Sequence, residues 1–244
     1  MSDPTAAMLT IGDEILSGRT QDTNMNHLAR ALTLKGIALC EARTVPDIAA
    51  EIVAAVNALR GRYSHVFTSG GIGPTHDDIT ADAVAAAFGV PIDVREDARA
   101  ILAANYPDPA DLNPARLRMA RIPEGATLIL NPVSRAPGFS LGNVHVMAGV
   151  PAVFQAMVAN LLPTLAGGAP MLSDNLRIER PEGRIAGPLE RLARAHPQVS
   201  AGSYPFSAPG IYGADIVLRS RDPAALAAAM EDLRRMADAL LAEP

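Results

Sequence analysis

The segment His65–Thr80 constrains the fold most, because it combines a strand, a glycine loop and the approach to a helix. Residues 65–68 are β-branched and aromatic, which is typical of a short buried strand. Gly70, Gly71 and Gly73 then permit positive φ angles and let a ligand approach the backbone closely. A glycine loop that leads into a helix presents free backbone N–H groups to an anion, usually a phosphate. The segment therefore predicts a phosphate site.

The helix after this loop is expected to follow Thr75 directly. Threonine is a good N-cap residue, and Asp78 stands three residues later, where the acidic partner of a capping box belongs. Apolar residues then recur at helical spacing as far as Phe88, and Gly89 ends the run.

Two neighbouring acids, Asp77 and Asp78, distinguish this loop from the common phosphate loops. No Lys-Ser or Lys-Thr follows the glycines, and the glycine spacing differs from the dinucleotide fingerprint. Two carboxylates repel a bound phosphate unless a divalent cation lies between them or one is protonated. The functional interpretation is a phosphate with a Mg²⁺-like metal, in which Asp77 or Asp78 is a metal ligand or a base. The alternative is that both acids only favour the helix dipole.

The first strand is expected to deliver a second set of acids to the same place. The apolar run 6–11 ends at Gly12, Asp13 and Glu14. Open parallel sheets bind ligands outside the carboxyl ends of their strands. These residues should therefore share an edge with the glycine loop. The intervening chain predicts helices over 25–35 and 47–60 and a strand over 37–45, an order typical of a doubly wound α/β domain.

The rest of the chain predicts a second unit after a linker. Helices are expected over 96–105, 115–120 and 152–165, with a strand over 127–130 and a hairpin over 139–147. Pro151 suits a first helical turn and leaves the N–H groups around Gly149 free for a ligand. Glycines and a proline at 167–170 then separate a first domain, 1–166, from a small α+β domain, 167–244. That domain has the order β-α-β-β-α, with helices on one face of the sheet and a loop over 205–210.

Composition excludes several classes of protein. The net charge is −5 and the isoelectric point is near 5.5, which argues against a nucleic-acid partner. The single cysteine, Cys40, cannot form an internal disulfide. Neither a signal peptide nor an apolar run long enough to span a bilayer is found, so we expect a cytoplasmic protein without a membrane partner.

Several motifs together resemble the molybdopterin-binding (MoaB/Mog-like) domain family, in the form found in competence/damage-inducible protein A and eukaryotic FAD synthases. The segments that carry the resemblance are Gly12–Gly18 with Thr23-Asn24, Gly70–Thr80, Asn131-Pro-Val with Ala136-Pro-Gly-Phe139, and Gly149-Val-Pro151. Two positions depart from many relatives. Ala148 stands where many relatives have a proline. His76 stands where many relatives have a basic residue, and a histidine here matches the FAD-synthase version instead.

The resemblance implies a three-layer α/β/α sandwich and a homo-oligomer. It also implies a small phosphorylated ligand and a divalent metal. Asp77, Asp78 and Asp13 would be catalytic, with Asp77 and Asp78 also as metal ligands. The residues expected to bind the ligand are Gly12, Glu14, Ser17, Asn24, Gly70, Gly71, Gly73, Pro74, Thr75, His76, Thr80, Gly149 and Pro151.

Three functions remain open from the sequence. Members of the family hydrolyse the pyrophosphate of ADP-ribose or FAD, or bind and adenylylate molybdopterin. The third possibility is a ligand-sensing module without chemistry, and the intact acids argue against it. His76 favours the pyrophosphatase. The sequence also ends without the amidohydrolase or adenylyl-transferring domains of those relatives, so amidase and FAD-synthesis activities are not expected.

Overall fold

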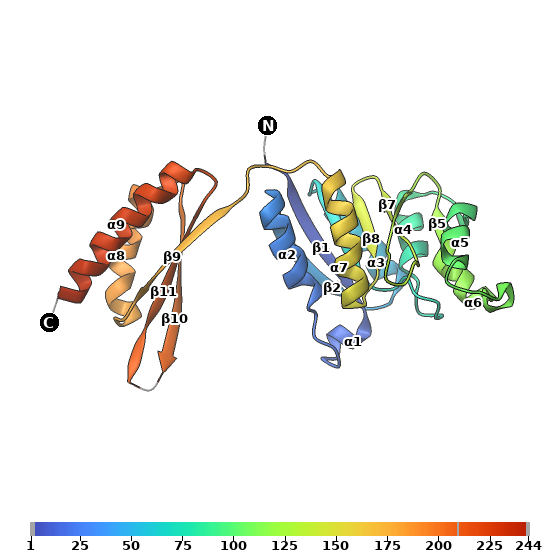
Figure 1. The fold of residues 1–244 in the computed structure, drawn as a ribbon, viewed down its shortest axis with the longest axis horizontal. Helices are drawn as coiled ribbons and strands as arrows, with labels where there is room; N and C mark the ends of the chain where they lie inside the picture. Colours follow the sequence, from blue (N-terminus) through green and yellow to red (C-terminus); the bar gives the residue numbers. More distant parts are fainter. Residues whose placement is uncertain (1–2, 209, 243–244) are drawn as a thin grey trace. The chain divides into compact units, whose positions relative to one another are not determined.

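The structure is a computed structural model that describes residues 3–208 and 210–242. The chain divides into two compact units, Met1–Gly168 and Ala169–Pro244 (Figure 1). Within the described residues, no helix is both long enough and apolar enough to cross a bilayer.

The first unit is built on a six-stranded sheet with the order β2-β1-β3-β8-β7-β6. The first four of these strands are parallel, whereas β7 pairs antiparallel with both β8 and β6. Their bounds are β1 Thr5–Ile11, β2 Ala38–Val45, β3 His65–Ser69, β6 Thr127–Ile129, β7 Gly138–Leu141 and β8 Val144–Met147. The predicted α/β class and the hairpin over 139–147 are confirmed.

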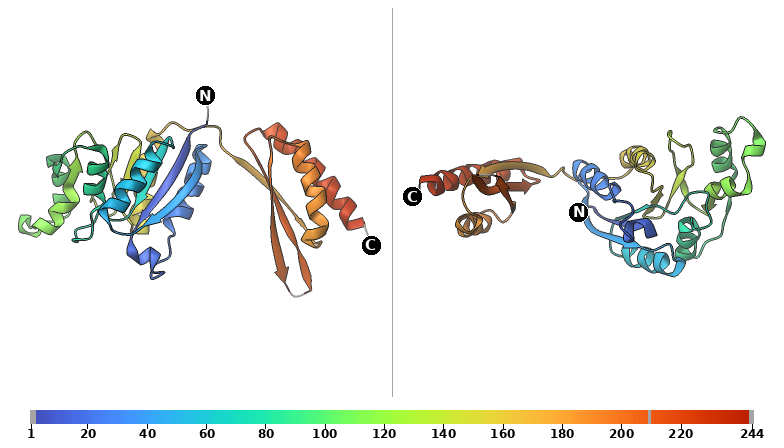
Figure 2. Two further views of the ribbon diagram at one scale, coloured as in Figure 1. Left: turned by 180° about the vertical axis from the view of Figure 1, so that it is seen from behind. Right: turned by 90° about the horizontal axis from the view of Figure 1, so that it is seen from below.

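Helices cover both faces of this sheet, because side chains of successive strand residues point to opposite faces. On β1, Ala6 and Met8 pack against α2 (Asn24–Lys35) and α7 (Pro151–Leu161). Ala7, Leu9 and Ile11 pack instead in the cluster that contains α3 (Ala49–Arg60) and α4 (Thr80–Phe88). Figure 2 shows helices on either side of the strands. This arrangement is the expected three-layer α/β/α sandwich.

A short two-stranded sheet joins the outer part of the first unit, and the sequence did not predict it. β4 (Ile92–Val94) pairs antiparallel with β5 (Arg121–Pro123). Each strand has only three residues, one of them charged, which is too short for an alternating pattern to stand out. Between them lie α5 (Glu96–Ala103), α6 (Pro114–Leu117) and a 3₁₀ turn, Arg118–Ala120.

The second unit is a three-stranded antiparallel sheet with the order β10-β11-β9 and two helices. Its elements are β9 Leu172–Ile178, α8 Glu182–Ala195, β10 Ser200–Ala208, β11 Ile211–Ser220 and α9 Pro223–Ala242. Both helices share one apolar core with the sheet. The predicted β-α-β-β-α order is confirmed.

Two local predictions are wrong. Thr75 does not cap a helix, because α4 begins at Thr80, where the backbone N–H donates to the Gly71 carbonyl. The loop expected from residue 205 is part of β10, in which Pro205 pairs with Ala214. Proline fits there because β10 is an edge strand and its missing N–H is not needed by a second neighbour.

Candidate ligand-binding site

Three neighbouring strands end at one edge of the first sheet, and their loops meet there. Gly12 follows β1 and its N–H donates to the Val45 carbonyl at the end of β2, 3.2 Å away. Gly70 follows β3 and donates to the Met147 carbonyl at the end of β8, 3.1 Å away. Gly149 then follows β8. The predicted site segments therefore gather at the carboxyl ends of β1, β3 and β8.

The glycine loop is packed too closely for side chains. Gly70 has φ of 110°, and a Cβ there would lie 2.2 Å from the Ile11 carbonyl oxygen. Gly71 has φ of 69°, and its Cβ would lie 2.1 Å from Oγ1 of Thr80. Thr80 is fully buried, and its hydroxyl donates to the Gly70 carbonyl at 3.0 Å. Thr80 thus closes the loop from within.

The buried side chain of Asn24 connects the loops by hydrogen bonds. It is 4% exposed, and its Nδ2 donates to Ser69 Oγ at 2.9 Å and to the Gly149 carbonyl at 2.7 Å. The cap of α2 comes instead from Asp22, whose Oδ1 accepts from the backbone N–H groups of Asn24 and Met25. Asn24 therefore joins the ends of β3 and β8 to the start of α2.

A cavity of about 510 Å³ opens above these loops, which is within the usual size range of small-molecule sites. It is lined by Glu14, Thr20, Gly70, Gly71, Ile72, Gly73, Pro74, Asp78, Met119, Ser134, Ala136, Ala148, Gly149, Val150, Pro151 and Val153. Its lining combines the glycine backbone and two carboxylates with apolar side chains, so the cavity suits a phosphorylated ligand with an apolar ring.

A smaller cavity of about 50 Å³ shares Glu14, Thr20, Gly149 and Pro151 with the large one. Most of its lining residues are of polar types, and Asn24 is one of them. The predicted site is thus divided between two adjoining spaces that have part of their walls in common.

The acids of the glycine loop differ in their surroundings. Asp78 lines the large cavity, and its Oδ2 accepts from the Thr75 backbone N–H at 2.8 Å and hydroxyl at 2.5 Å. The Asp77 side chain is 61% exposed and His76 is 99% exposed. The nearby Thr75 side chain and the backbone N–H of Asp77 itself hold the pKa of the Asp77 carboxyl below its usual value. Asp77 is therefore ionised at neutral pH.

Asp47 is a candidate that the sequence analysis missed. Its Oδ2 accepts the backbone N–H of Asp13 at 3.0 Å. Partial burial raises the pKa of the Asp47 carboxyl, and the charges of Asp13, Glu14 and Asp77 raise it further. Asp47 follows β2, so the rule that selected Asp13 and Glu14 also applies to it.

These carboxylates are hard oxygen donors of the kind that Mg²⁺ takes. The described ranges, 3–208 and 210–242, contain no ready group of three or more His, Cys, Asp or Glu ligands. Mg²⁺ commonly binds through one or two carboxylates together with substrate phosphates and waters. The chemistry is compatible with such a metal, which Asp78 of the cavity lining could hold together with a ligand phosphate.

The structure brings together about half of the predicted residues. Those that line the large cavity are Glu14, Gly70, Gly71, Gly73, Pro74, Asp78, Gly149 and Pro151, and Asn24 lines the small one. Those outside both linings are Gly12, Asp13, Ser17, Thr75, His76, Asp77 and Thr80. The functional roles of all of them stay predictions. Ile72, Met119 and Thr20 were not predicted, although Ile72 lies within the glycine loop itself.

Comparison with known sequences identifies the family. Residues 7–167 match the family described as "Probable molybdopterin binding domain". The chain belongs to this molybdopterin-binding domain family. Residues 170–243 match the family described as "FAD synthase, middle domain", which covers the second unit.

Individual relatives agree with this assignment. A Caldivirga maquilingensis protein is 36% identical over 66% of this chain, and the chain spans 64% of that protein's length. The "CinA-like protein" of Citrifermentans bemidjiense is 38% identical over 66% of this chain, which spans 40% of it. The crystal structure of CinA from Thermoplasma acidophilum, titled as a protein of unknown function, matches at 36% identity with a TM-score of 0.63. That match covers 66% of this chain and 98% of the other.

Proposed function

We propose that this chain binds a nucleotide or pterin that carries a phosphate or pyrophosphate group. We further propose that it hydrolyses the pyrophosphate of a dinucleotide of the ADP-ribose or FAD type with the help of a divalent metal. The single observation that carries the proposal is the large cavity, whose lining combines Gly70, Gly71, Gly73 and Gly149 with two carboxylates and apolar side chains.

The glycine backbone would hold the phosphates. Loops at the carboxyl ends of parallel strands can direct N–H groups at an anion, and side chains at Gly70 and Gly71 would collide with the neighbouring chain. Ile72, Met119 and Val153 would contact the ring of the ligand. In this proposal the glycine backbone contacts the charged part of the ligand, and the apolar side chains contact its ring.

The carboxylate of Asp78, which lines the cavity, would act on the water as a base. In the hydrolysis, the water oxygen bonds to one phosphorus as the bridging P–O bond breaks. A carboxylate takes the proton of the water, and two phosphate monoesters result. A bound divalent metal would lower the pKa of the water and offset the phosphate charge.

Molybdopterin binding or adenylylation is the second candidate, and the description of the matched family favours it. The same glycine backbone would bind the pterin phosphate, and the apolar wall would hold the pterin. The third candidate, a ligand-sensing module, needs the cavity but not the acids.

A hydrolysis screen separates the three candidates. ADP-ribose, FAD and related dinucleotides would be incubated with the protein and Mg²⁺ or Mn²⁺, with molybdopterin binding measured in parallel. The proposal expects metal-dependent release of AMP from at least one dinucleotide. Molybdopterin binding without any hydrolysis would support the second candidate. Tight dinucleotide binding with no turnover would support the third candidate, the ligand-sensing module.

A further inference from the structure

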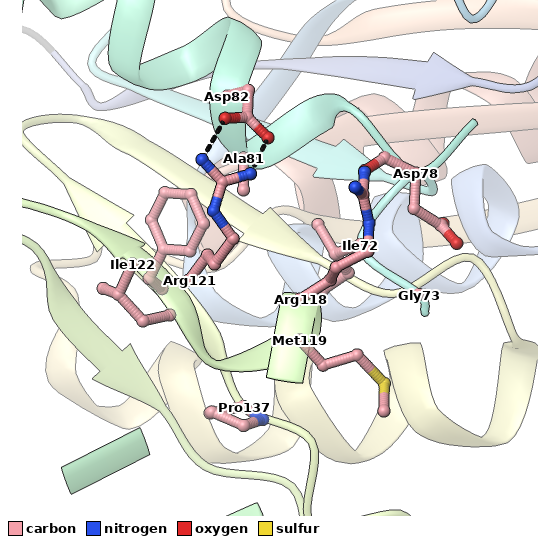
Figure 3. A pocket seen from close by; sticks show the side chains of 11 residues that line it. Ile72, Gly73, Asp78, Ala81, Asp82, Arg118, Met119, Arg121, Ile122 and Pro137 are labelled. Atoms are coloured by element: carbon pink, nitrogen blue, oxygen red, sulfur yellow. Dashed lines mark hydrogen bonds and ion pairs between the residues drawn. The ribbon is translucent and has the colours of Figure 1, made fainter. Parts of the chain in front are cut away.

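Arg118 lies beside the glycine loop and has no counterion among the residues that the structure describes. It begins the 3₁₀ turn before β5, and its Nη2 donates to the backbone carbonyl of Asp78 at 3.2 Å. Figure 3 shows its guanidinium next to the Asp78 main chain. The Asp78 carboxylate is engaged by Thr75 instead. Among the residues that the structure describes, no carboxylate forms an ion pair with Arg118.

The hydrogen bonds of Arg118 are also incomplete. Its Nε is buried and has no acceptor within the described chain. Arg118 is partly buried, and a buried donor without an acceptor costs free energy. The hydrogen bonds of Arg118 therefore do not by themselves explain why an arginine stands in this position.

Arg121 offers a direct comparison three residues further on. Both arginines line a third cavity, which lies between the glycine loop and β5 (Figure 3). Arg121 forms a two-bond ion pair with Asp82 at 2.7 Å, so its charge is neutralised. Arg118 has no such carboxylate partner among the described residues, so its charge is not neutralised by an ion pair.

The ligand cavity lacks such a charge of its own. No lysine, arginine or histidine is part of its lining in the described chain, whereas Glu14 and Asp78 are. The cavity lined by Arg118 and Arg121 shares Ile72, Gly73, Asp78 and Met119 with the ligand cavity, so Arg118 lies immediately behind the loop without an ion pair in the described chain. An anionic ligand beside two carboxylates needs positive charge nearby.

We infer that Arg118 supplies the positive charge that lets the glycine loop hold a phosphate group beside Asp78. The inference rests on the proposed phosphorylated ligand and names a residue that selects for its charge. Arg118 acts through the loop it contacts, so it is a positioning residue. Its charge, more than its hydrogen bond to Asp78, determines the affinity for phosphate.

Calorimetric titration tests the charge against the hydrogen bond. Inorganic pyrophosphate, ADP-ribose and adenosine would be titrated with Mg²⁺ into the wild-type chain, Arg118→Gln, Arg118→Lys and the matched control Arg121→Gln. Gln and Lys can both donate to the Asp78 carbonyl, but only Lys is charged. Arg118→Gln should weaken binding of the two phosphate ligands at least tenfold. Arg118→Lys and Arg121→Gln should stay within threefold of the wild type.

Two further measurements show whether Arg118 acts through its charge or only supports the structure of the loop. Adenosine, which has no phosphate, should bind equally to Arg118→Gln and the wild type. The loss for pyrophosphate should shrink as salt rises from 0.05 to 0.3 M, because salt screens charge. Equal affinity of Arg118→Gln and Arg118→Lys for pyrophosphate would overturn the inference. Intact pyrophosphate binding without hydrolysis would count only against the proposed enzyme activity. A wild-type chain that binds neither phosphate ligand would overturn both.

Discussion

The two ends of β3 and β8 differ in what they bury. At the amino end, His65 Nδ1 and His145 Nε2 lie 3.1 Å apart, and Ser140 Oγ lies 2.8 Å from His145 Nδ1. At the carboxyl end, the same strands lead into Gly70 and Gly149, which border open cavities. One end satisfies its polar groups internally, whereas the other presents backbone and carboxylates to the cavities. The amino end should thus affect stability, and the carboxyl end should affect binding.

The largest expected effect is at Gly71. A Cβ at φ of 69° and 2.1 Å from the Thr80 hydroxyl must displace the loop. Gly71→Ala should weaken ADP-ribose binding by more than about a hundredfold, roughly 3 kcal/mol. Gly89→Ala is the matched control, because Gly89 has φ of 67° but no atom within 4 Å. It should cost about 1 kcal/mol of stability and leave binding unchanged in calorimetry. Equal binding losses in both variants would show that strain, not the site, is responsible.

Asp78→Asn is expected to reduce turnover with little change in stability. The amide oxygen of Asn can still accept from Thr75, so the free energy of unfolding should change by less than about 1 kcal/mol. Metal-dependent hydrolysis should fall by at least roughly a hundredfold. Asp77→Asn, at the exposed acid outside the cavity lining, tests the second predicted acid in the same assay. Wild-type turnover in Asp78→Asn would refute a role for this carboxylate in the chemistry.

The histidine pair should make the first unit less stable in mild acid. Burial lowers the pKa of His145 to about 3, and burial also lowers the pKa of His65. Below pH 6.5 the unfolded chain binds protons that the folded chain does not, so stability falls as pH falls. Between pH 7 and pH 5, His145 alone should account for about 2 kcal/mol.

Amide hydrogen exchange in β3 and β8 measures this effect, after correction for the intrinsic rate at each pH. His145→Gln removes the titrating group, so most of the dependence between pH 7 and pH 5 should disappear in that variant. An unchanged slope in His145→Gln would contradict the assignment of the amino end as a stabilising polar pair.

The smallest effect is expected at Met119, on the apolar side of the cavity. Met119→Ala should weaken ADP-ribose binding about tenfold, because the ring loses contact area. Inorganic pyrophosphate has no ring, so its affinity should not change. Equal losses for both ligands in calorimetry would mean that Met119 supports the loop rather than the ring.

The sequence predicts the carboxyl end far better than the amino end. The rule that ligands bind where parallel strands end correctly placed Gly70 and Glu14 at one edge, and it would also have placed Asp47 there. Arg118 and Met119 could not be predicted, because they reach the site through pairing of β4 with β5. His65 and His145 are eighty residues apart, so only the register of β3 with β8 brings them together. Thr75 was misassigned because its turn with Asp78 closes before the helix begins.

Backbone amide NMR during titration with ADP-ribose and Mg²⁺ tests the central claim most directly, because it locates the ligand on the molecule. The shifts of Gly70, Gly71, Gly73 and Gly149 should change with a common dissociation constant. The amides of Ser140 and His145, at the opposite end of the sheet, should not change. Perturbations confined to the amino end of the sheet or to residues 169–242, or no perturbation at millimolar ligand, would contradict the claim.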